Sequence, residues 1–219
     1  MSVTHLLQTN ERIDAVLFLN GILPERTLLE AYASVPFIAA DGAANALMDM
    51  GIVPDILCGD LDSVNDHVLD AVRSHGTIIV DPNQDDNDFE KALRVASNSL
   101  WNAVLIVGIH GGELEHTLNN WSVLMRHGRT MRLLALDGDR VGIPVYDSFT
   151  YTALPEEIIS IIPQPRVRLT TEGLQWQLRD EILELGTREG ARNRAVQSDV
   201  TITVHEGSAL VFVSARSHQ

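Results

Sequence analysis

The sequence predicts an α/β fold: an N-terminal three-layer α/β domain with a mostly parallel sheet, followed by a small C-terminal β-sandwich domain. Across the first 140 residues, short apolar runs alternate with longer segments of helical period, which is typical of a parallel sheet covered by helices. Beyond residue 140, strand-like segments follow one another between Pro and Gly turns, with little helical period. The 219 residues, 45% of them hydrophobic, are enough for two such cores.

In the first part, the expected strands are short apolar runs that helices would bury. They are Asp14–Asn20, Phe37–Ala40, Ile56–Gly59, Thr77–Val80, Ala103–Gly108 and Met131–Leu136. The helices expected between them are Glu25–Ser34, Ala43–Met50, Asn65–His75, Asp88–Leu100 and Leu114–His127. Because chemistry collects at the carboxyl ends of parallel strands, we expect the polar loops after four of these strands to meet in one cleft.

In the second part, the expected strands are separated by Pro or Gly. They are Val145–Ala153, Ile158–Ile162, Val167–Thr171, Leu174–Leu178, Val200–His205 and Ala209–Val213. We therefore expect two domains, residues 1–140 and 141–219, joined without a flexible linker.

The charge of the chain excludes some classes of function. The formal net charge is −14, so binding to a nucleic-acid backbone or to an anionic membrane is not expected. The apolar runs are too short for a transmembrane helix, and the polar N-terminus is unlike a signal peptide. One cysteine, Cys58, allows no internal disulfide. We expect a soluble, cytoplasmic protein.

The acidic residues are concentrated in one stretch. Residues 41–90 hold twelve acids and one base, Arg73. Several acids stand close together, notably Asp60 with Asp62, and Asp85 with Asp86 and Asp88. Clustered carboxylates repel one another unless cations neutralise them, and carboxylate oxygens suit magnesium, manganese or calcium. The pattern favours a divalent-metal site over a plain acidic surface.

Several familiar motifs are missing. The single lysine, Lys91, follows a glutamate, so no Gly-Lys phosphate loop exists. There is no Gly-x-Gly-x-x-Gly, no Gly-x-Ser-x-Gly and no His-Glu-x-x-His. The stretch that starts at Asp81 has Asp86 where a calcium-binding EF-hand loop needs glycine, and Ala92 where it needs glutamate.

Five motifs occur in a fixed order. They are Asp41–Asn45, Pro54–Ser63, Gln84–Leu93, Gly111–Leu118 and Gly173–Leu178, with Asn193 after the last. In these motifs the chain resembles the thiamin pyrophosphokinase family over nearly its whole length. The resemblance implies an α/β domain, a β-sandwich and a homodimer with active sites between subunits. It also implies transfer of the pyrophosphoryl group of ATP to the hydroxyl of thiamin, giving thiamin diphosphate and AMP, with Mg²⁺ as cofactor.

The resemblance also implies the site residues. Asp60, Asp62 and Asp88 match the family's metal and phosphate site, and Asp41 matches an acid beside it; we expect all four to be catalytic. The residues expected to contact ATP or thiamin are Gly42, Gln84, Asn87, Lys91, Gly111, Gly112, Glu115 and Asn193. Thiamin and ATP are the expected small-molecule partners.

Some of these residues have a plain structural interpretation as well. Lys91 is as readily an exposed partner of neighbouring acids as a phosphate ligand. Asn45 is expected to bond the Gly42 turn, and His116 to be structural rather than catalytic. Trp176 is expected in the core or at an interface, not as a stacking platform.

Three departures from the family pattern keep alternatives open. Asn87 stands where the family has threonine, and both side chains can donate a hydrogen bond. Glu113 replaces a phosphate-facing arginine, while Arg192 stands in the loop that resembles the thiamin-contacting one. Either the two changes are unrelated, or Arg192 reaches across a dimer to pair with Glu113 or to contact phosphate itself. The alternatives to the kinase are a pyrophosphotransferase for another alcohol and a diverged, non-catalytic nucleotide- or thiamin-binding protein.

Overall fold

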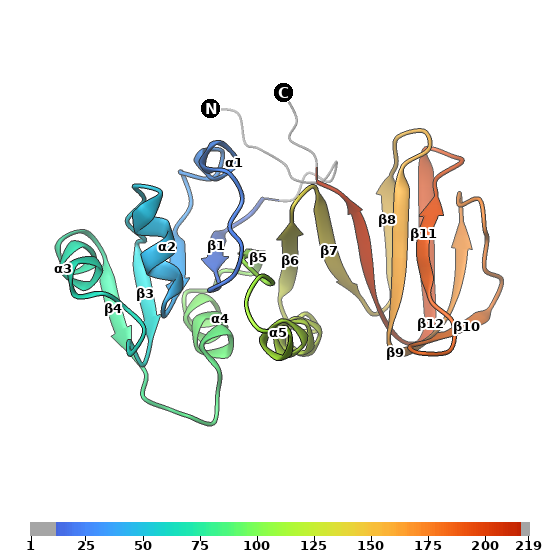
Figure 1. The fold of residues 1–219 in the computed structure, drawn as a ribbon. Helices are drawn as coiled ribbons and strands as arrows, with labels where there is room; N and C mark the ends of the chain where they lie inside the picture. Colours follow the sequence, from blue (N-terminus) through green and yellow to red (C-terminus); the bar gives the residue numbers. More distant parts are fainter. Residues whose placement is uncertain (1–11, 216–219) are drawn as a thin grey trace. The chain divides into compact units, whose positions relative to one another are not determined.

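The computed structural model describes residues 12–215, and these divide into two units. Of the described residues, 12–137 form the first unit and 138–215 the second. In Figure 1 the first unit runs from blue to green and the second continues to red. Each unit buries its own set of apolar strands.

The first unit is built on a parallel sheet with the strand order β6-β5-β1-β2-β3-β4. The strands are β1 (Ala15–Phe18), β2 (Phe37–Ala40), β3 (Ile56–Gly59), β4 (Thr77–Val80), β5 (Ala103–Val107) and β6 (Arg132–Asp137). The central strands β1 and β2 are buried at every residue, because helices cover both faces of the sheet there. The edge strand β4 is largely exposed.

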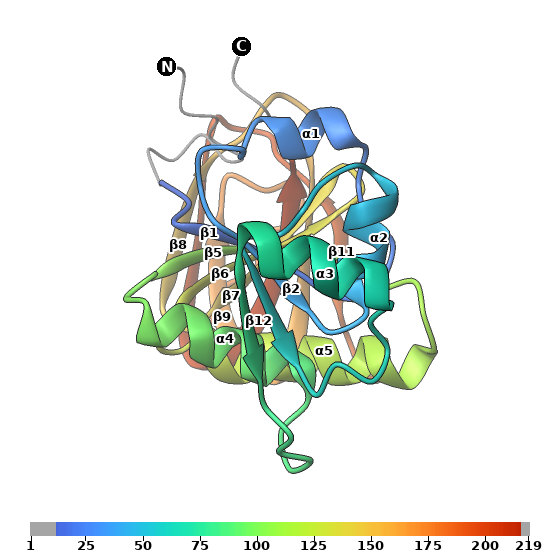
Figure 2. The ribbon, with the colours of Figure 1, turned by 90° about the vertical axis from the view of Figure 1, so that its left-hand side faces the viewer.

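Helices connect these strands and cover both faces. They are α1 (Arg26–Glu30), α2 (Ala43–Asp49), α3 (Asp66–His75), α4 (Asp88–Asn98) and α5 (Leu114–His127). Helices α1 to α3 lie on one face, and α4 and α5 lie on the other (Figures 1 and 2). The predicted three-layer α/β arrangement is confirmed. No helix within residues 12–215 is long and apolar enough to cross a membrane.

The strand order reverses between β1 and β5. The chain winds outward from β1 to β4 and then returns to β5 on the other side of β1. Right-handed crossovers put the helices of the two directions on opposite faces. Such a reversal opens a crevice at the carboxyl ends of the neighbouring strands. The loops after β1 to β5 therefore reach one edge of the sheet.

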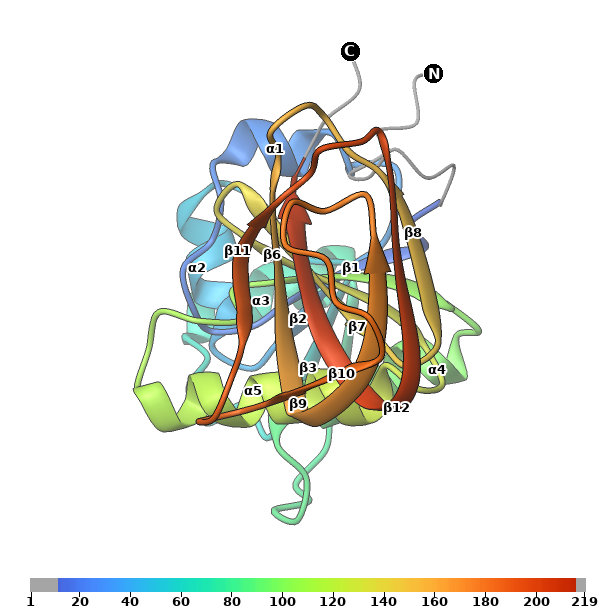
Figure 3. The same cartoon turned by 90° about the vertical axis from the view of Figure 1, so that its right-hand side faces the viewer.

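The second unit is antiparallel and is organised around two long strands. Its strands are β7 (Arg140–Val145), β8 (Ser148–Thr152), β9 (Ile158–Glu172), β10 (Glu181–Glu184), β11 (Gly190–Arg194) and β12 (Asp199–Ser214). Strands β9 and β12 pair with each other over most of their length. At one end β11 joins β9 and β7 joins β12, and at the other end β10 joins β9 and β8 joins β12. Two four-stranded layers thus share the same two long strands (Figure 3).

The long strands shift register where the two layers meet. The pairing of β9 with β12 changes register between Gly207 and Ala209. Gly207 has φ 84°, and a Cβ there would lie 2.1 Å from the Arg166 carbonyl oxygen, so glycine is required. Along β9 and much of β12, buried residues alternate with partly exposed ones, which gives each layer one apolar face. This confirms the predicted C-terminal β domain.

Two pairs of predicted strands are single strands. Ile158–Ile162 and Val167–Thr171 both belong to β9, and the two prolines between them lie where the ladder shifts rather than where it ends. Val200–His205 and Ala209–Val213 likewise both belong to β12. The prolines and glycines were wrongly interpreted as strand ends, because a bulge uses the same residues as a turn.

Other predicted strands of the second unit were also wrong. Val145–Ala153 is divided, since β7 ends at Val145 and β8 begins at Ser148. Leu174–Leu178 forms no strand, and only an isolated bridge joins Leu174 to Ala195. Strands β10 and β11 were not predicted. Their sequences are short and rich in charged or polar residues, which suits the edge positions they occupy.

Candidate active site

A cleft of about 790 Å³ lies at the carboxyl edge of the sheet in the first unit. It spans the reversal of strand order, because Asn20 after β1 and His110 after β5 both line it. Loops after β2, β3 and β4 and residues of α4 and α5 line the rest. The strand-end loops that the sequence places on one edge therefore do share one cleft.

Three aspartates come together at this edge. One carboxylate oxygen from each of Asp41, Asp60 and Asp62 lies within 4.8 Å of the others. Asp41 ends β2 with φ 43°, and its backbone N–H donates to the Cys58 carbonyl oxygen of β3 at 2.8 Å. Gly59 lets the two loops approach, because a Cβ there would lie 3.0 Å from Asp41 Cβ. The ends of two adjacent strands thus hold the group together.

Asp41 is the buried member of this group, at 7% exposure. Its Oδ1 is buried and makes no hydrogen bond within the described part of the chain. Burial is the largest cause that raises the pKa of Asp41, and the charges of Asp88 and Asp60 raise it further. A buried carboxylate oxygen without a donor is unfavourable, and a cation bound beside it would remove that cost.

Asp60 is held by a side chain from a distant loop. Gln84 Nε2 donates to Asp60 Oδ2 at 3.0 Å, and this hydrogen bond is the largest cause that lowers the pKa of Asp60. Asp62 is exposed and accepts a hydrogen bond from Ser63 Oγ at 2.9 Å. The ligands that this group offers to a metal ion are therefore all carboxylate oxygens. Asp41 Oδ1 has no hydrogen-bond partner among the described residues. Such a set fits a hard divalent cation such as Mg²⁺.

Asp88, the third predicted metal ligand, is not one of the three grouped aspartates. It begins α4, lines the cleft, and accepts a hydrogen bond from Lys91 Nζ at 3.0 Å. In the group that could hold a metal, Asp41 takes the place expected for Asp88.

Lys91 is 4% exposed, so the expectation of an exposed side chain is wrong, although the expected pairing with a neighbouring acid is present in its ion pair with Asp88. Burial by itself would lower the pKa of Lys91, but the hydrogen bond and charge of Asp88 raise it above its ordinary value. A charged ammonium group is therefore held at the wall of the cleft.

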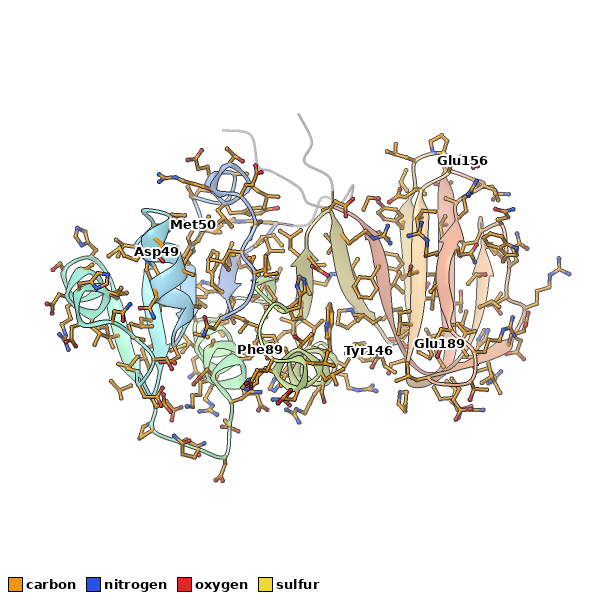
Figure 4. All side chains as sticks on the ribbon, viewed as in Figure 1. Asp49, Met50, Phe89, Tyr146, Glu156 and Glu189 are labelled. Carbon is orange, nitrogen blue, oxygen red and sulfur yellow. The ribbon has the colours of Figure 1, made fainter. Side chains whose placement is uncertain are left out.

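The N-terminus of α4 is fixed by a capping box. Asn87 Oδ1 accepts from the Glu90 N–H at 2.9 Å, and the Glu90 side chain accepts from the Asn87 N–H. Asn87 thus acts as an acceptor, where the sequence suggested a donor. Phe89, labelled in Figure 4, is 2% exposed and anchors the same turn in the core. This turn sets the positions of Asp88 and Lys91.

The predicted glycines have different roles. Gly42 and Gly112 line the cleft, but Gly111 does not. At Gly111 a Cβ would lie 2.3 Å from Ile22 Cγ1, and φ is 115°. That glycine is required for packing against Ile22 rather than for access of a ligand.

Two other predicted contact residues lie away from the cleft. Glu115 is in the first turn of α5 but is not part of the cleft wall. Asn193 lies in the second unit, where its buried side chain bonds the Trp176 backbone N–H at 3.2 Å and carbonyl at 2.7 Å.

Asn45 does not bond the Gly42 turn through its side chain. Its Nδ2 donates to the Ser63 carbonyl at 2.7 Å, and its Oδ1 accepts from the Asn65 N–H at 3.0 Å. It therefore braces the loop that carries Asp62.

Glu113 and His116 both line the cleft, with carboxylate and imidazole 3.3 Å apart. Arg192 lies in the second unit, where its backbone N–H donates to Ser160 Oγ at 2.9 Å. Coupling between Glu113 and Arg192 stays a prediction.

The site residues named from the sequence leave out several groups of the cleft wall, Arg126 and His110 among them. Arg126 lines it and donates to Glu90 Oε1 at 2.6 Å, from α5 to α4. His110 lines it and lies 3.1 Å from Asp137 Oδ1. The position of His110 after a strand was an available signal, whereas the pairing of Arg126 with Glu90 depends on how two helices pack.

A smaller groove of about 190 Å³ lies on the second unit. It is lined by Trp176, Leu183 and Asn193, among others, with Glu189 (labelled in Figure 4) also on its wall. Trp176 is 57% exposed, so it does not lie in the core, and its expected place at an interface stays a prediction. The groove wall thus contains both an aromatic ring and a carboxylate.

Comparison with known proteins identifies both units. Residues 30–134 match the family model described as "Thiamin pyrophosphokinase, catalytic domain", and residues 150–209 match "Thiamin pyrophosphokinase, vitamin B1 binding domain". Thiamine pyrophosphokinase 1 of Arabidopsis thaliana is 28% identical over 218 residues, covering 86% of this chain and 81% of its own. Thiamine pyrophosphokinase of Bacillus subtilis is 25% identical over 203 residues, covering 90% and 91%.

Solved structures agree on the fold. The crystal structure of thiamine pyrophosphokinase from Bacillus subtilis superposes with a TM-score of 0.78, at 21% identity, covering 92% of this chain and 98% of that one. Yeast thiamin pyrophosphokinase superposes with a TM-score of 0.80, at 19% identity, covering 96% and 89%. The two family models together match most of the sequence in the predicted order. The chain belongs to the thiamin pyrophosphokinase family.

Proposed function

We propose that this protein transfers the pyrophosphoryl group of ATP, as one unit, to the hydroxyl of thiamin, giving thiamin diphosphate and AMP. The observation that carries the proposal is the group of Asp41, Asp60 and Asp62, with its unpartnered buried oxygen, at the edge of a nucleotide-sized cleft. Most of the cleft wall lies in the segment that matches the catalytic-domain model, and the second unit contains the segment that matches the vitamin B1 binding model. These matches favour thiamin over another alcohol.

The grouped aspartates would hold Mg²⁺, and Asp88 lies close enough to raise the pKa of Asp41. Asp88 belongs to the site through its ion pair with the Lys91 ammonium, at 3.0 Å. Mg²⁺ held by these carboxylates would neutralise charge on the transferring phosphates, which in-line phosphoryl transfer needs. A carboxylate of the same group accepts the proton of the attacking hydroxyl.

Other residues of the cleft would position ATP. The buried, charged Lys91 ammonium faces the phosphates together with the guanidinium of Arg126. Gly42 and Gly112 let the backbone approach the nucleotide. Gln84 holds the Asp60 carboxylate by a hydrogen bond, and Asn87 caps the N-terminus of α4. Gly111 and Glu115 are not part of the cleft wall, so they are left out of the proposed contacts.

The groove of the second unit would contribute to the thiamin site. Thiamin carries a cationic aromatic ring, which an exposed indole and a nearby carboxylate attract. Trp176 and Glu189 line the groove, and Asn193 fixes the backbone of Trp176. Asn193 lines the same groove, so it also stays among the proposed thiamin contacts.

We also propose a cytoplasmic homodimer. Leu154, Leu185 and Val196 expose apolar surface on the second unit that pairing would cover. The cytoplasm supplies ATP and keeps the free, buried thiol of Cys58 reduced.

The test is to incubate the protein with ATP, Mg²⁺ and a panel of vitamin alcohols and to measure AMP. We expect AMP to form with thiamin, in amounts equal to thiamin diphosphate, and to be abolished in an Asp60→Asn variant. AMP formed only with another alcohol would show that this alcohol, and not thiamin, accepts the pyrophosphoryl group. Tight binding of ATP or thiamin with no AMP would instead indicate a non-catalytic binder.

A further inference from the structure

The loop between β4 and α4 brings like charges together without a base of its own. Residues 81–87 contain Asp81, Asp85 and Asp86 and no Lys or Arg. These carboxylates repel one another and the aspartates across the cleft. The loop nevertheless has to keep one conformation, because Gln84 reaches from it to Asp60.

Arg94 supplies the counter-charge from the second turn of α4. Its Nη1 donates to Asp81 Oδ2 at 2.8 Å, and its Nη2 donates to Asp86 Oδ2. Asp81 begins the loop and Asp86 lies near its end. The planar fork of arginine suits two acceptors held in a fixed relation, which a lysine ammonium does not impose. One side chain thus joins both ends of the loop to a rigid helix.

Asn83 carries this constraint to the middle of the loop. Its Nδ2 donates to Asp86 Oδ2 at 3.1 Å, and its backbone N–H donates to Asp81 Oδ1 at 3.1 Å. Its Oδ1 accepts from the Asp85 N–H at 2.9 Å. Gln84, placed between these bonded residues, therefore has a fixed backbone from which its amide reaches Asp60.

We propose that Arg94 is a positioning residue for the metal-binding carboxylates. It holds Asp81 and Asp86 in place, and this fixes the loop from which Gln84 bonds Asp60. Asp60 is thereby kept close to Asp41 and Asp62. Arg94 touches none of the three grouped aspartates, so it acts through the loop. The inference rests on the proposed function only in assigning a divalent cation to that group. Nothing in the comparisons assigns a role to this arginine.

The test measures Mn²⁺ affinity by electron paramagnetic resonance, without ATP or thiamin. Arg94→Gln should raise the Kd for Mn²⁺ about 10-fold. This is the lower end of the loss in metal affinity expected when a residue that orients a metal ligand, without binding the metal itself, is replaced. Gln84→Ala should have a similar effect. The double variant should bind Mn²⁺ no more weakly than the weaker-binding single variant, because both substitutions break the same chain of contacts. Additive losses would show that Arg94 does not act through Gln84.

The sign of the change separates positioning from simple electrostatics. Removing a cation beside a metal site makes the site more negative, so an electrostatic role alone predicts tighter Mn²⁺ binding in Arg94→Gln. Arg94→Lys keeps the charge but loses the fork, and positioning predicts only partial recovery. Tighter binding in Arg94→Gln, or full recovery in Arg94→Lys, would overturn the proposal.

A matched control is available on α3. Arg73 bonds Asp70 at 3.0 Å on an exposed surface, so Arg73→Gln should leave Mn²⁺ affinity unchanged. A lower melting temperature in Arg94→Gln with unchanged Mn²⁺ affinity would mark a purely structural residue. If the native protein releases no AMP but loses Mn²⁺ affinity in Arg94→Gln, the proposed function fails and the positioning role stands.

Discussion

Asp41 is the residue at which folding and function make opposite demands. Its carboxylate is buried, one oxygen has no hydrogen-bond partner within residues 12–215, and its pKa is raised chiefly by burial. A residue chosen for stability alone would be neutral at this position. The unfavourable carboxylate is explained if a cation occupies the group that it forms with Asp60 and Asp62.

Replacing Asp41 with asparagine should therefore stabilise the metal-free protein near neutral pH. A carboxyl whose folded-state pKa is raised destabilises the fold above that pKa, and the penalty disappears once the group is protonated. The gain in melting temperature of Asp41→Asn should shrink as the pH falls through the folded-state pKa towards about 4. Mg²⁺ should stabilise the native protein more than the variant. Equal melting temperatures at all pH values would contradict this account of Asp41.

Asp62 separates activity from stability most cleanly. It is exposed, and its carboxylate accepts a hydrogen bond from the neighbouring Ser63 hydroxyl. Asp62→Asn should lower turnover at least about 100-fold, because it removes a charge that holds the cation at the reacting phosphates. The melting temperature should stay the same or rise, because a repelling charge is lost. A variant that melts early and remains active would show that Asp62 is structural.

At the scale of elements, α4 joins the fold to the site. Its capping box fixes the first turn, and Phe89 lies on its buried face. Lys91 and Arg94 follow in the first and second turns. The sequence order Asn87-Asp88-Phe89-Glu90 thus serves helix initiation and the cleft together. A change at the cap should lower stability and disturb the site at once.

Asn87→Ala should lower the free energy of unfolding by about 1 kcal/mol, the usual loss for an N-cap side chain. Asn87→Thr should recover most of it, because a threonine hydroxyl also accepts the Glu90 N–H. Urea denaturation of the two variants beside the native protein measures both effects. A threonine variant as unstable as the alanine variant would show that the cap is not the role of Asn87.

The sequence predicts the first unit well, since each strand is a short apolar run and each acid cluster directly follows one. It predicts the second unit less well. Pro163 and Gly207 break the alternation of long strands without ending them, and the polar strand at Gly190–Arg194 has no apolar pattern to find. The grouping of Asp60 and Asp62 follows from adjacency in sequence. The clamp by Arg94 does not, because it depends on how α4 turns against its own loop.

At the scale of the whole molecule, the chain divides the work between two units. The first holds the acid-lined cleft, and the second carries the groove with the exposed Trp176. The second unit is near the lower limit of size for an independent core, and it exposes Leu154, Leu185 and Val196.

Pairing of two copies would bury this surface, so we expect a dimer in solution. Light scattering at micromolar concentration should give twice the mass of 24.1 kDa. Leu185→Glu should shift the mass towards that of one chain, whereas Leu100→Glu, on the first unit, should not. A monomeric mass for the native protein would remove both the dimer and the idea of a shared site.

The most direct test of the central claim is calorimetric titration of ATP into the native protein, with Mg²⁺ and again with EDTA. The cleft is lined by Asp41, Asp60, Asp85, Asp86 and Asp88, with Lys91 and Arg126 as its only Lys or Arg among the described residues. Without a divalent cation, the phosphates would meet these carboxylates in a partly desolvated site, at a cost of several kcal/mol, roughly. We expect ATP to bind with Mg²⁺ and its affinity to collapse with EDTA. Equal affinity under both conditions would contradict the assignment of this cleft as a metal-dependent ATP site.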